Sequence, residues 1–143
     1  MVDVRQKGAA GEYKVRDLLR NKTGLPWERV PMSGALPYLK GDLYVPHSQM
    51  HYCVEVKNYK DPAIDHLLIQ GKPKLLSWWN QTLEQTKLPQ EPVLFFRWNR
   101  SRIYVMIQGM PLEVDDFIFL NHLNASILLA EDWLDLDKPE FIK

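Results

Sequence analysis

Two short alternating runs set the architecture of this chain: Gly41-Asp42-Leu43-Tyr44-Val45 and, a few residues later, Tyr52-Cys53-Val54-Glu55-Val56-Lys57. Each run is rich in β-branched and aromatic residues, which are typical of strands. The segment 46–51 between them opens with proline and is polar enough to form a turn. The pattern therefore predicts a β-hairpin.

A hairpin that is symmetric about its midpoint places Asp42 directly opposite Glu55. Facing residues on paired strands point their side chains to the same side of the sheet, and Lys57, two residues beyond Glu55, shares that side. Two carboxylates and an ammonium group are therefore expected to converge at one end of the sheet. The other face of the hairpin is apolar and is expected to enter the core; it carries Leu43, Val45, Val54 and Val56.

This polar face has two interpretations. Carboxylates held close together repel each other, which raises the pKa of one of them unless a divalent cation neutralises the charge. Oxygen ligands of this kind suit Mg²⁺, with Mn²⁺ as a substitute, and these ions usually take one or two carboxylates together with waters and substrate phosphate. The alternative is an ordinary solvated hairpin face that carries an Asp, a Glu and a Lys.

The composition describes one globular domain. The chain has 143 residues, 45% of them hydrophobic and 25% charged, so it is long enough to bury a core, and we expect a single domain over residues 1–143. It contains neither an apolar run of membrane-spanning length nor a basic-then-apolar leader, so we expect a cytoplasmic protein that does not enter membranes. Its one cysteine, Cys53, excludes an internal disulfide framework and is interpreted as a small core residue.

Charge is unevenly distributed although the net charge is zero. Residues 1–60 carry ten Lys or Arg against six Asp or Glu, which gives +4, whereas residues 101–143 carry three against eight, which gives −5. A basic front beside a carboxylate cluster suits a metal-dependent enzyme that acts on nucleic acid. Chance segregation of charge in a neutral protein is the alternative.

A first helix is predicted from about Arg5 to Asn21, with Asp3 as a candidate cap. Its buried stripe follows helical spacing: Gly8, Gly11 or Glu12, Val15, and Leu18 or Leu19. Glu12 then lies on or beside the apolar face, where a carboxylate is costly unless it is paired or bound to metal; the alternative is a boundary position that reaches water. The glycines lower helix propensity by about 1 kcal/mol each relative to alanine, which favours a close-approach role for them.

Taken in order, four motifs resemble those of the archaeal-type Holliday junction resolvases, small homodimeric members of the PD-(D/E)XK nuclease superfamily. They are Lys7-Gly8-x3-Glu12, Ser33-Gly34, Gly41-Asp42 and Glu55-Val56-Lys57. The resemblance implies an α/β fold of the restriction-endonuclease type, in which helices flank a mixed central β-sheet. It covers residues 5–60 well and extends to about 107 by element order.

The resemblance also implies roles for individual residues. Asp42, Glu55, the backbone carbonyl of Val56 and Glu12 would hold Mg²⁺, Lys57 would act on the attacking water, and Ser33 would contribute to the active site from its loop. Cleavage of a four-way junction needs two symmetric cuts, so a homodimer on branched DNA is implied.

Beyond the hairpin, the sequence predicts a helix from about Pro73 to Lys87, two strands at 92–97 and 102–107, a helix at 112–123, an edge strand at 126–130 and an acidic tail anchored by Trp133. A short strand at 26–30 precedes the hairpin. In the 73–87 helix, Trp79 is expected in the core, and Trp78 is expected either at a dimer contact or at the edge of the core.

Several basic residues are candidate DNA contacts. Lys72 and Lys74 flank a helix N-terminus that favours anions, and three arginines with Trp98 surround the predicted hairpin tip at 98–101, where they could grip a backbone and stack on an unpaired base. Solvated lysines and a solubilising tip are the alternatives. The full set of candidates is Lys7, Lys60, Lys72, Lys74, Arg97, Arg100 and Arg102.

Three functions are therefore weighed. Resolution of Holliday junctions is favoured; a nuclease of the same chemistry that cuts flap, single-stranded or linear duplex DNA is the first alternative; a non-catalytic DNA-binding or assembly protein of the same fold is the second. The histidines lack zinc-ligand spacing and no Gly-rich nucleotide loop is present, so neither zinc nor a nucleotide cofactor is expected. Self-association would draw on Trp78, the 67–69 run and the apolar face of 112–123.

Overall fold

The computed structural model of the chain describes residues 4–31, 39–60 and 73–143. Its elements, in chain order, are α1 (Val4–Thr23), β1 (Glu28–Arg29), β2 (Leu43–Tyr44), β3 (Tyr52–Tyr59), α2 (Lys74–Gln85), β4 (Glu91–Trp98), β5 (Tyr104–Gln108), β6 (Ile118–Leu120), the 3-10 turn η2 (Asn121–Leu123), β7 (Ala125–Leu129), α3 (Ala130–Asp132) and the wider helical turn η3 (Trp133–Asp137). The predicted order of a helix, three strands, a helix and two strands is confirmed.

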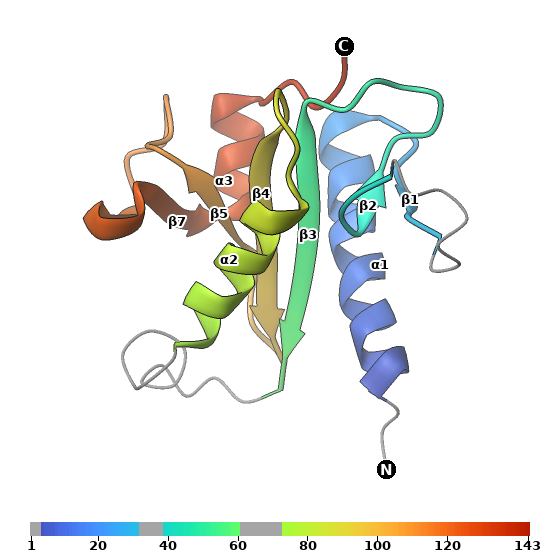
Figure 1. The fold of residues 1–143 in the computed structure, drawn as a ribbon, viewed down its shortest axis with the longest axis horizontal. Helices are drawn as coiled ribbons and strands as arrows, with labels where there is room; N and C mark the ends of the chain where they lie inside the picture. Colours follow the sequence, from blue (N-terminus) through green and yellow to red (C-terminus); the bar gives the residue numbers. More distant parts are fainter. Residues whose placement is uncertain (1–3, 32–38, 61–72) are drawn as a thin grey trace.

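The strands form one mixed sheet in the order β1-β2-β3-β4-β5-β7-β6. The neighbouring pairs are antiparallel except β3 and β4, which run parallel because α2 provides the crossover between them. Figure 1 shows α1 alongside β3, with β1 and β2 at one side of the sheet and β5 and β7 at the other. The predicted fold class, an α/β domain with a restriction-endonuclease-like mixed sheet, is confirmed.

Both faces of the sheet are covered, because alternate residues of the central strands enter different cores. The larger core joins Val15 and Leu19 of α1 to Val54 and Val56 of β3 and to the C-terminal segment. The smaller core joins Leu75 and Trp79 of α2 to Leu94 and Phe96 of β4, with Met106 and Ala125. Trp79 is therefore a core residue, as predicted.

The hairpin has the predicted register. Leu43 pairs with Val54, and this pairing puts Asp42 opposite Glu55. The four apolar hairpin residues all lie in the larger core, with exposed fractions of 6% or less: Leu43, Val45, Val54 and Val56. The chain reverses between the strands with His47 in the left-handed region, at φ 62°.

Helix α1 follows the predicted stripe where its side chains are described. Val15 and Leu19 are fully buried. Gly11 faces β3 so closely that an added Cβ would lie 2.6 Å from Cβ of Asn58. A residue without a side chain is therefore needed for the helix to approach the strand, which confirms the close-approach role expected of Gly11.

Two predictions for the C-terminal third are wrong. The segment 112–123 is not a helix: it is an extended turn followed by β6 and η2. Its apolar residues at helical spacing pack differently, because Phe119 and Leu120 pair with Ser126 and Ala125 of β7, while Asn124 in the left-handed region tightens the connection. Consequently β7 is an interior strand, between β5 and β6, and β6 takes the edge.

The last residues return to the sheet. Trp133 and Phe141 are buried and lie edge to face at 5.7 Å; the 5.0 Å contact between Phe141 and Trp27 joins this segment to the residues that follow α1. Backbone bonds from His51 to Phe141 and from Lys143 to Gln49 pair the chain end with the hairpin turn. In the described ranges, no helix is both long and apolar enough to cross a bilayer.

Candidate active site

Asp42 is positioned where β2 approaches β3. Its backbone amide donates to the carbonyl of Val54 at 2.7 Å, and its Oδ2 accepts from the amide of Val56 at 2.7 Å. Gly41 makes this approach possible: its φ is +85°, and an added Cβ would lie 2.7 Å from the Val54 carbonyl oxygen. The carboxylate is thus fixed against the strand that carries the other site residues.

Glu55 lies beside Asp42 and is almost enclosed, with 6% of its surface exposed. Its carboxyl group lies close enough to that of Asp42 for their interaction to favour the protonated form of Glu55. Burial, and then the charge of Asp42, raise the pKa of Glu55 to about 8. Without a cation, the pair therefore retains a proton at neutral pH.

Lys57 and the carbonyl of Val56 complete the hairpin part of the site. The positive charge of Lys57 opposes the rise in the pKa of both Glu55 and Glu12. The ammonium group therefore interacts with both carboxylates. The amide of Val56 points toward Asp42. Because the N–H and C=O of one strand residue point to the same edge, the Val56 carbonyl is directed to that side as well.

Glu12 reaches the edge of this group from α1 but is held by another residue. Arg29 of β1 donates from Nε to its carboxylate, as a direct ion pair. Burial, and then Asp42, raise the pKa of Glu12, while Arg29 and Lys57 oppose that rise. The buried position predicted for Glu12 therefore has a partner: the side chain is 16% exposed and paired with a guanidinium.

The donor chemistry fits a divalent cation at Asp42 and Glu55. Two carboxyl groups that must share a proton when alone form a set that an oxygen-preferring cation can occupy in place of that proton. The described residues contain no group of three or more His, Cys, Asp or Glu side chains gathered closely enough to hold a metal. The third carboxylate near the pair, that of Glu12, is bonded to Arg29.

Other predicted residues are placed as follows. Ser33 and Lys72 lie outside the described residues, as does the side chain of Lys7. Lys60 is exposed just beyond β3. Lys74 is exposed in the first turn of α2, and its ammonium group lies 5.7 Å from the ring centroid of Tyr59.

The three arginines near the β4–β5 connection differ from one another. Arg97 is only 7% exposed and donates to Asn58 Oδ1 of the neighbouring strand β3 at 3.3 Å. The expectation that Arg97 faces DNA from a surface tip therefore does not hold. Arg100 is exposed at the tip with φ 64°. Arg102 is exposed and paired with Glu131 at 3.5 Å.

The aromatic residues near this tip pack on one another. Trp98 stacks on Tyr104 at 5.2 Å and 13°, so one face of the indole is covered. Trp78 contacts Tyr59 and Phe96, which places it at the edge of the smaller core. Of the two interpretations of Trp78, the structure supports the core edge.

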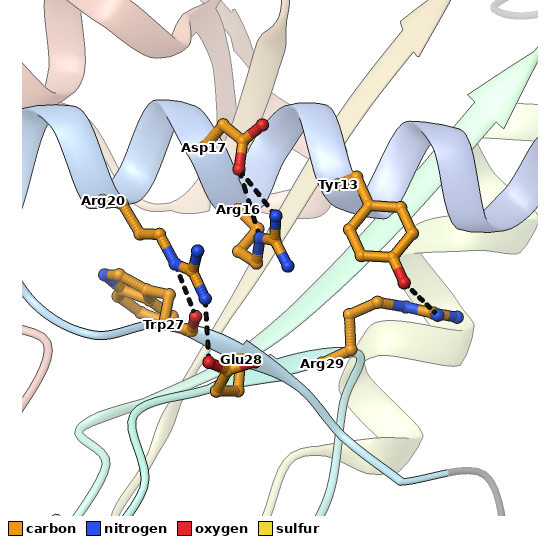
Figure 2. Close-up of polar contacts among 7 residues, drawn as sticks. All are labelled: Tyr13, Arg16, Asp17, Arg20, Trp27, Glu28 and Arg29. Atoms are coloured by element: carbon orange, nitrogen blue, oxygen red, sulfur yellow. Dashed lines mark hydrogen bonds and ion pairs between the residues drawn. The ribbon is translucent and has the colours of Figure 1, made fainter.

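The sequence analysis did not identify a group of residues beside Glu12. Arg29 pairs with Glu12 and contacts Tyr13, and Tyr13 in turn contacts Arg16. Figure 2 shows Tyr13 and Arg16 projecting from α1 toward the β1 segment that carries Arg29. Arg29 donates to the Tyr13 hydroxyl at 3.3 Å. One signal was available: Tyr13 and Arg16 are three residues apart and therefore neighbours on the helix surface next to Glu12.

An Asp at a glycine-led strand start, a Glu-x-Lys on the next strand and a mixed sheet between helices define the class of PD-(D/E)XK nucleases. Comparison with known families agrees: residues 3–126 match the family described as "Phage putative PDDEXK endonuclease". The chain belongs to this family of phage endonucleases.

The chain is also similar to a phage protein. The chain is 42% identical over 148 aligned positions to "Protein D14" of Escherichia phage T5, and the alignment covers 93% of this chain and 92% of that protein. No solved structure gives a significant match. Nucleases of this superfamily usually use a divalent metal, which agrees with the carboxylate pair described above.

Proposed function

We propose that this protein is a Mg²⁺-dependent endodeoxyribonuclease that resolves four-way DNA junctions as a homodimer in the cytoplasm of an infected host. One observation carries the catalytic part: Asp42, directly before β2, is fixed against β3 by the Val56 amide and lies opposite Glu55 in the hairpin register, beside Lys57. The junction part rests on the motif order Lys7-Gly8-x3-Glu12, Ser33-Gly34, Gly41-Asp42 and Glu55-Val56-Lys57.

In this proposal, Asp42, Glu55 and the Val56 carbonyl hold the cation. When bound, such an ion lowers the pKa of water and stabilises charge that develops on the scissile phosphate. Asp42 is pre-positioned for this by its bond to the Val56 amide. Glu12 completes or water-bridges the set only if it leaves Arg29, its partner in this structure.

Lys57 acts on the reacting groups. Its ammonium group lies on the same face as Glu55, and its charge is felt by both Glu55 and Glu12. From there it would hold the attacking water or a phosphate oxygen by charge-assisted hydrogen bonds. It would thus stabilise the transition state more than the bound substrate.

The test compares a labelled four-way junction with flap, single-stranded and linear duplex DNA of matched sequence, in Mg²⁺ and in EDTA. The proposal requires Mg²⁺-dependent cuts that are paired and symmetric on opposing strands of the junction. Faster cleavage of flap or linear DNA would replace the junction assignment by a different nuclease substrate. Binding without any cleavage in Mg²⁺ or Mn²⁺ would instead favour a DNA-binding or assembly protein.

The first prediction concerns the carboxylate pair. Asp42→Asn and Glu55→Gln should each lower the cleavage rate at least ~100-fold, because each removes a charge that the cation needs, while DNA affinity is kept or improves. Asn can still accept the hydrogen bond from the Val56 amide, so Asp42→Asn isolates charge from shape. Single-turnover cleavage together with a binding titration measures both effects, and wild-type rates in either variant would refute the site.

A further inference from the structure

Two guanidinium groups converge on one tyrosine ring at the surface of α1. The Cζ of Arg16 lies 4.6 Å from the Tyr13 ring centroid and the Cζ of Arg29 lies 5.0 Å from it. These contacts are short enough for favourable cation–π attraction. Tyr13 is nevertheless 42% exposed, so the group forms part of the solvent-facing surface.

The group borders a recess of about 260 Å³. Its lining comes from α1 and from the segment around β1: Tyr13, Arg16, Glu28, Arg29, Val30 and Pro31. The recess lies next to the catalytic carboxylates, because the Val30 amide donates to the Asp42 carbonyl at 2.9 Å and Arg29 pairs in register with Leu43. The recess is therefore close to a phosphodiester held at Asp42.

The arginines of this region do not all have the same role. Arg20 donates to the carbonyl of Trp27 and to Glu28, both at 2.8 Å, and so ties the β1 segment to α1. Arg16 contacts only its exposed sequence neighbour Asp17, among the polar contacts drawn in Figure 2. An ion pair with an exposed carboxylate contributes little and is readily exchanged for a phosphate.

Each charged side chain that lines the recess forms an ion pair with a neighbouring residue. Arg16 forms an ion pair with Asp17, and Arg29 forms one with Glu12. The carboxylate of Glu28 is paired with Arg20. Each of the two guanidinium groups has five N–H donors in a rigid fork. Among the described residues, Arg16 donates from Nε and Nη2 and Arg29 donates from Nε and Nη1.

We propose that Tyr13, Arg16 and Arg29 form a binding site for a backbone phosphate of the cleaved DNA strand, one or a few nucleotides from the scissile bond. Tyr13 sets the two guanidinium groups side by side, and they bind the phosphate by charge-assisted hydrogen bonds. The inference rests on the proposed nuclease function, which it extends by naming the residues that hold the strand beside the catalytic carboxylates.

The test uses the full-length protein with Asp42→Asn, which removes cleavage, and follows junction binding by fluorescence anisotropy from low to high KCl. Into this background are placed Arg16→Gln, Tyr13→Leu and, as a control, Lys22→Gln. Lys22 is on the same helix and loses the same charge, but it pairs with Asp135 and does not line the recess. Thermal melting confirms that each variant is folded.

Arg16→Gln and Tyr13→Leu should each weaken binding at least ~5-fold. Arg16→Gln should also reduce the slope of log K against log[salt] by about 0.7–0.9, the value for one lost phosphate contact. Lys22→Gln should stay within about 2-fold of the background. An Arg16→Gln variant whose affinity and salt slope match those of Lys22→Gln would overturn the proposal.

Neutral methylphosphonate linkages, placed one at a time along the strand, locate the contact. At the phosphate that Arg16 binds, Arg16→Gln should cause no further loss of affinity, so the two changes are non-additive there. Additive losses at every position near the scissile bond would overturn the site. Either failure leaves Mg²⁺-dependent cleavage by the wild type unaffected, so it is distinguishable from failure of the nuclease assignment.

Discussion

At the scale of single residues, the burial of Glu55 beside Asp42 has a consequence for stability. The pKa of Glu55 is raised to about 8 in the folded protein, whereas an unfolded glutamate titrates near its ordinary value of 4.5. Between these two values, the folded state keeps a proton that the unfolded state has lost. The free energy of unfolding must therefore fall as the pH rises through this window.

The corresponding prediction is made for protein in EDTA. The contribution of Glu55 to the free energy of unfolding should be highest below about pH 4.5. It should decrease toward pH 8 by up to about 1.4 kcal/mol per pH unit. Glu55→Gln should remove most of this slope, since glutamine carries no proton to lose. Urea unfolding at several pH values measures it, and a slope unchanged by Glu55→Gln would contradict the assignment.

Mg²⁺ should act on the same window. A cation that replaces the shared proton binds more strongly as the pH rises, so added Mg²⁺ should raise the melting temperature more at pH 8 than at pH 6. The Asp42→Asn variant serves as the control, because it lacks one of the two charges.

Lys57 offers a kinetic prediction. Lys57→Ala should slow single-turnover cleavage by about 10²–10⁴-fold, the usual range for a group that assists proton transfer, and should change junction affinity much less. The reason is that Lys57 acts on the water and the transition state. If the rate at saturating enzyme were unchanged, Lys57 would be an ordinary solvated lysine on the hairpin face.

At the scale of elements, the site depends on how closely the start of β2 approaches β3. Gly41 and Gly24 both have positive φ, +85° and +72°. An alanine at 41 would collide with the Val54 backbone, whereas no described residue lies within 4 Å of an alanine Cβ at 24. An alanine at either position would thus have the strain of a left-handed backbone, but only the alanine at 41 would also collide with β3.

Gly24→Ala should therefore cost about 1–2 kcal/mol of stability, the strain of a left-handed residue. Gly41→Ala should cost more and should also lower cleavage strongly, because β2 must move and carry Asp42 away from Glu55. Chemical unfolding and cleavage assays on the two variants separate the effects. Equal stability and full activity in Gly41→Ala would show that the approach is not required.

Helix α1 serves two functions through two faces. Val15 and Leu19 enter the core, while Gly11 allows the helix to approach β3 at Asn58. The position of Glu12, next to Gly11, follows from that approach. The exposed Tyr13 and the half-buried Arg16 follow on the same helix beside the site, so one helix supplies both packing and candidate DNA contacts.

At the scale of the whole molecule, the expected dimer is relevant because one chain carries one carboxylate pair. Trp78 is covered by Tyr59 and Phe96, so it is a poor donor of interface area, and the 67–69 run lies outside the described residues. Large apolar side chains are exposed instead along the segment that leads to the edge strand β6: Met110, Leu112 and Ile118, at 56%, 85% and 61%.

A homodimer should therefore use this segment and bury on the order of 2,000 Å² or more if it is obligate. Sedimentation at micromolar concentration should show a dimer, and Leu112→Lys with Ile118→Lys should shift it to monomer. Leu88→Lys is the control, because Leu88 is 95% exposed on a different part of the chain. A wild-type monomer that stays monomeric on DNA would favour a flap or single-strand substrate.

Local sequence determined the hairpin and its chemistry. The alternation of residues 41–45 and 52–57 specifies both register and facing side, because a shift of one residue would expose Val54 and Val56 and bury charge without a partner. For the same reason the sequence alone groups Asp42, Glu55 and Lys57 on one face. The spacing of Val15 and Leu19 likewise sufficed to define α1.

Tertiary structure decided what local spacing leaves ambiguous. The spacing of the apolar residues in 112–123 fits a helix as well as a strand. The segment forms a strand because Phe119 and Leu120 pair with β7 and extend the sheet. Arg97 lies near the end of β4. Its side chain is buried there because β4 pairs in parallel with β3 along its whole length, up to Trp98 and Tyr59. The pairing of Glu12 with Arg29 joins residues from α1 and β1, and no periodicity within either segment specifies a contact that forms only when the two elements pack together.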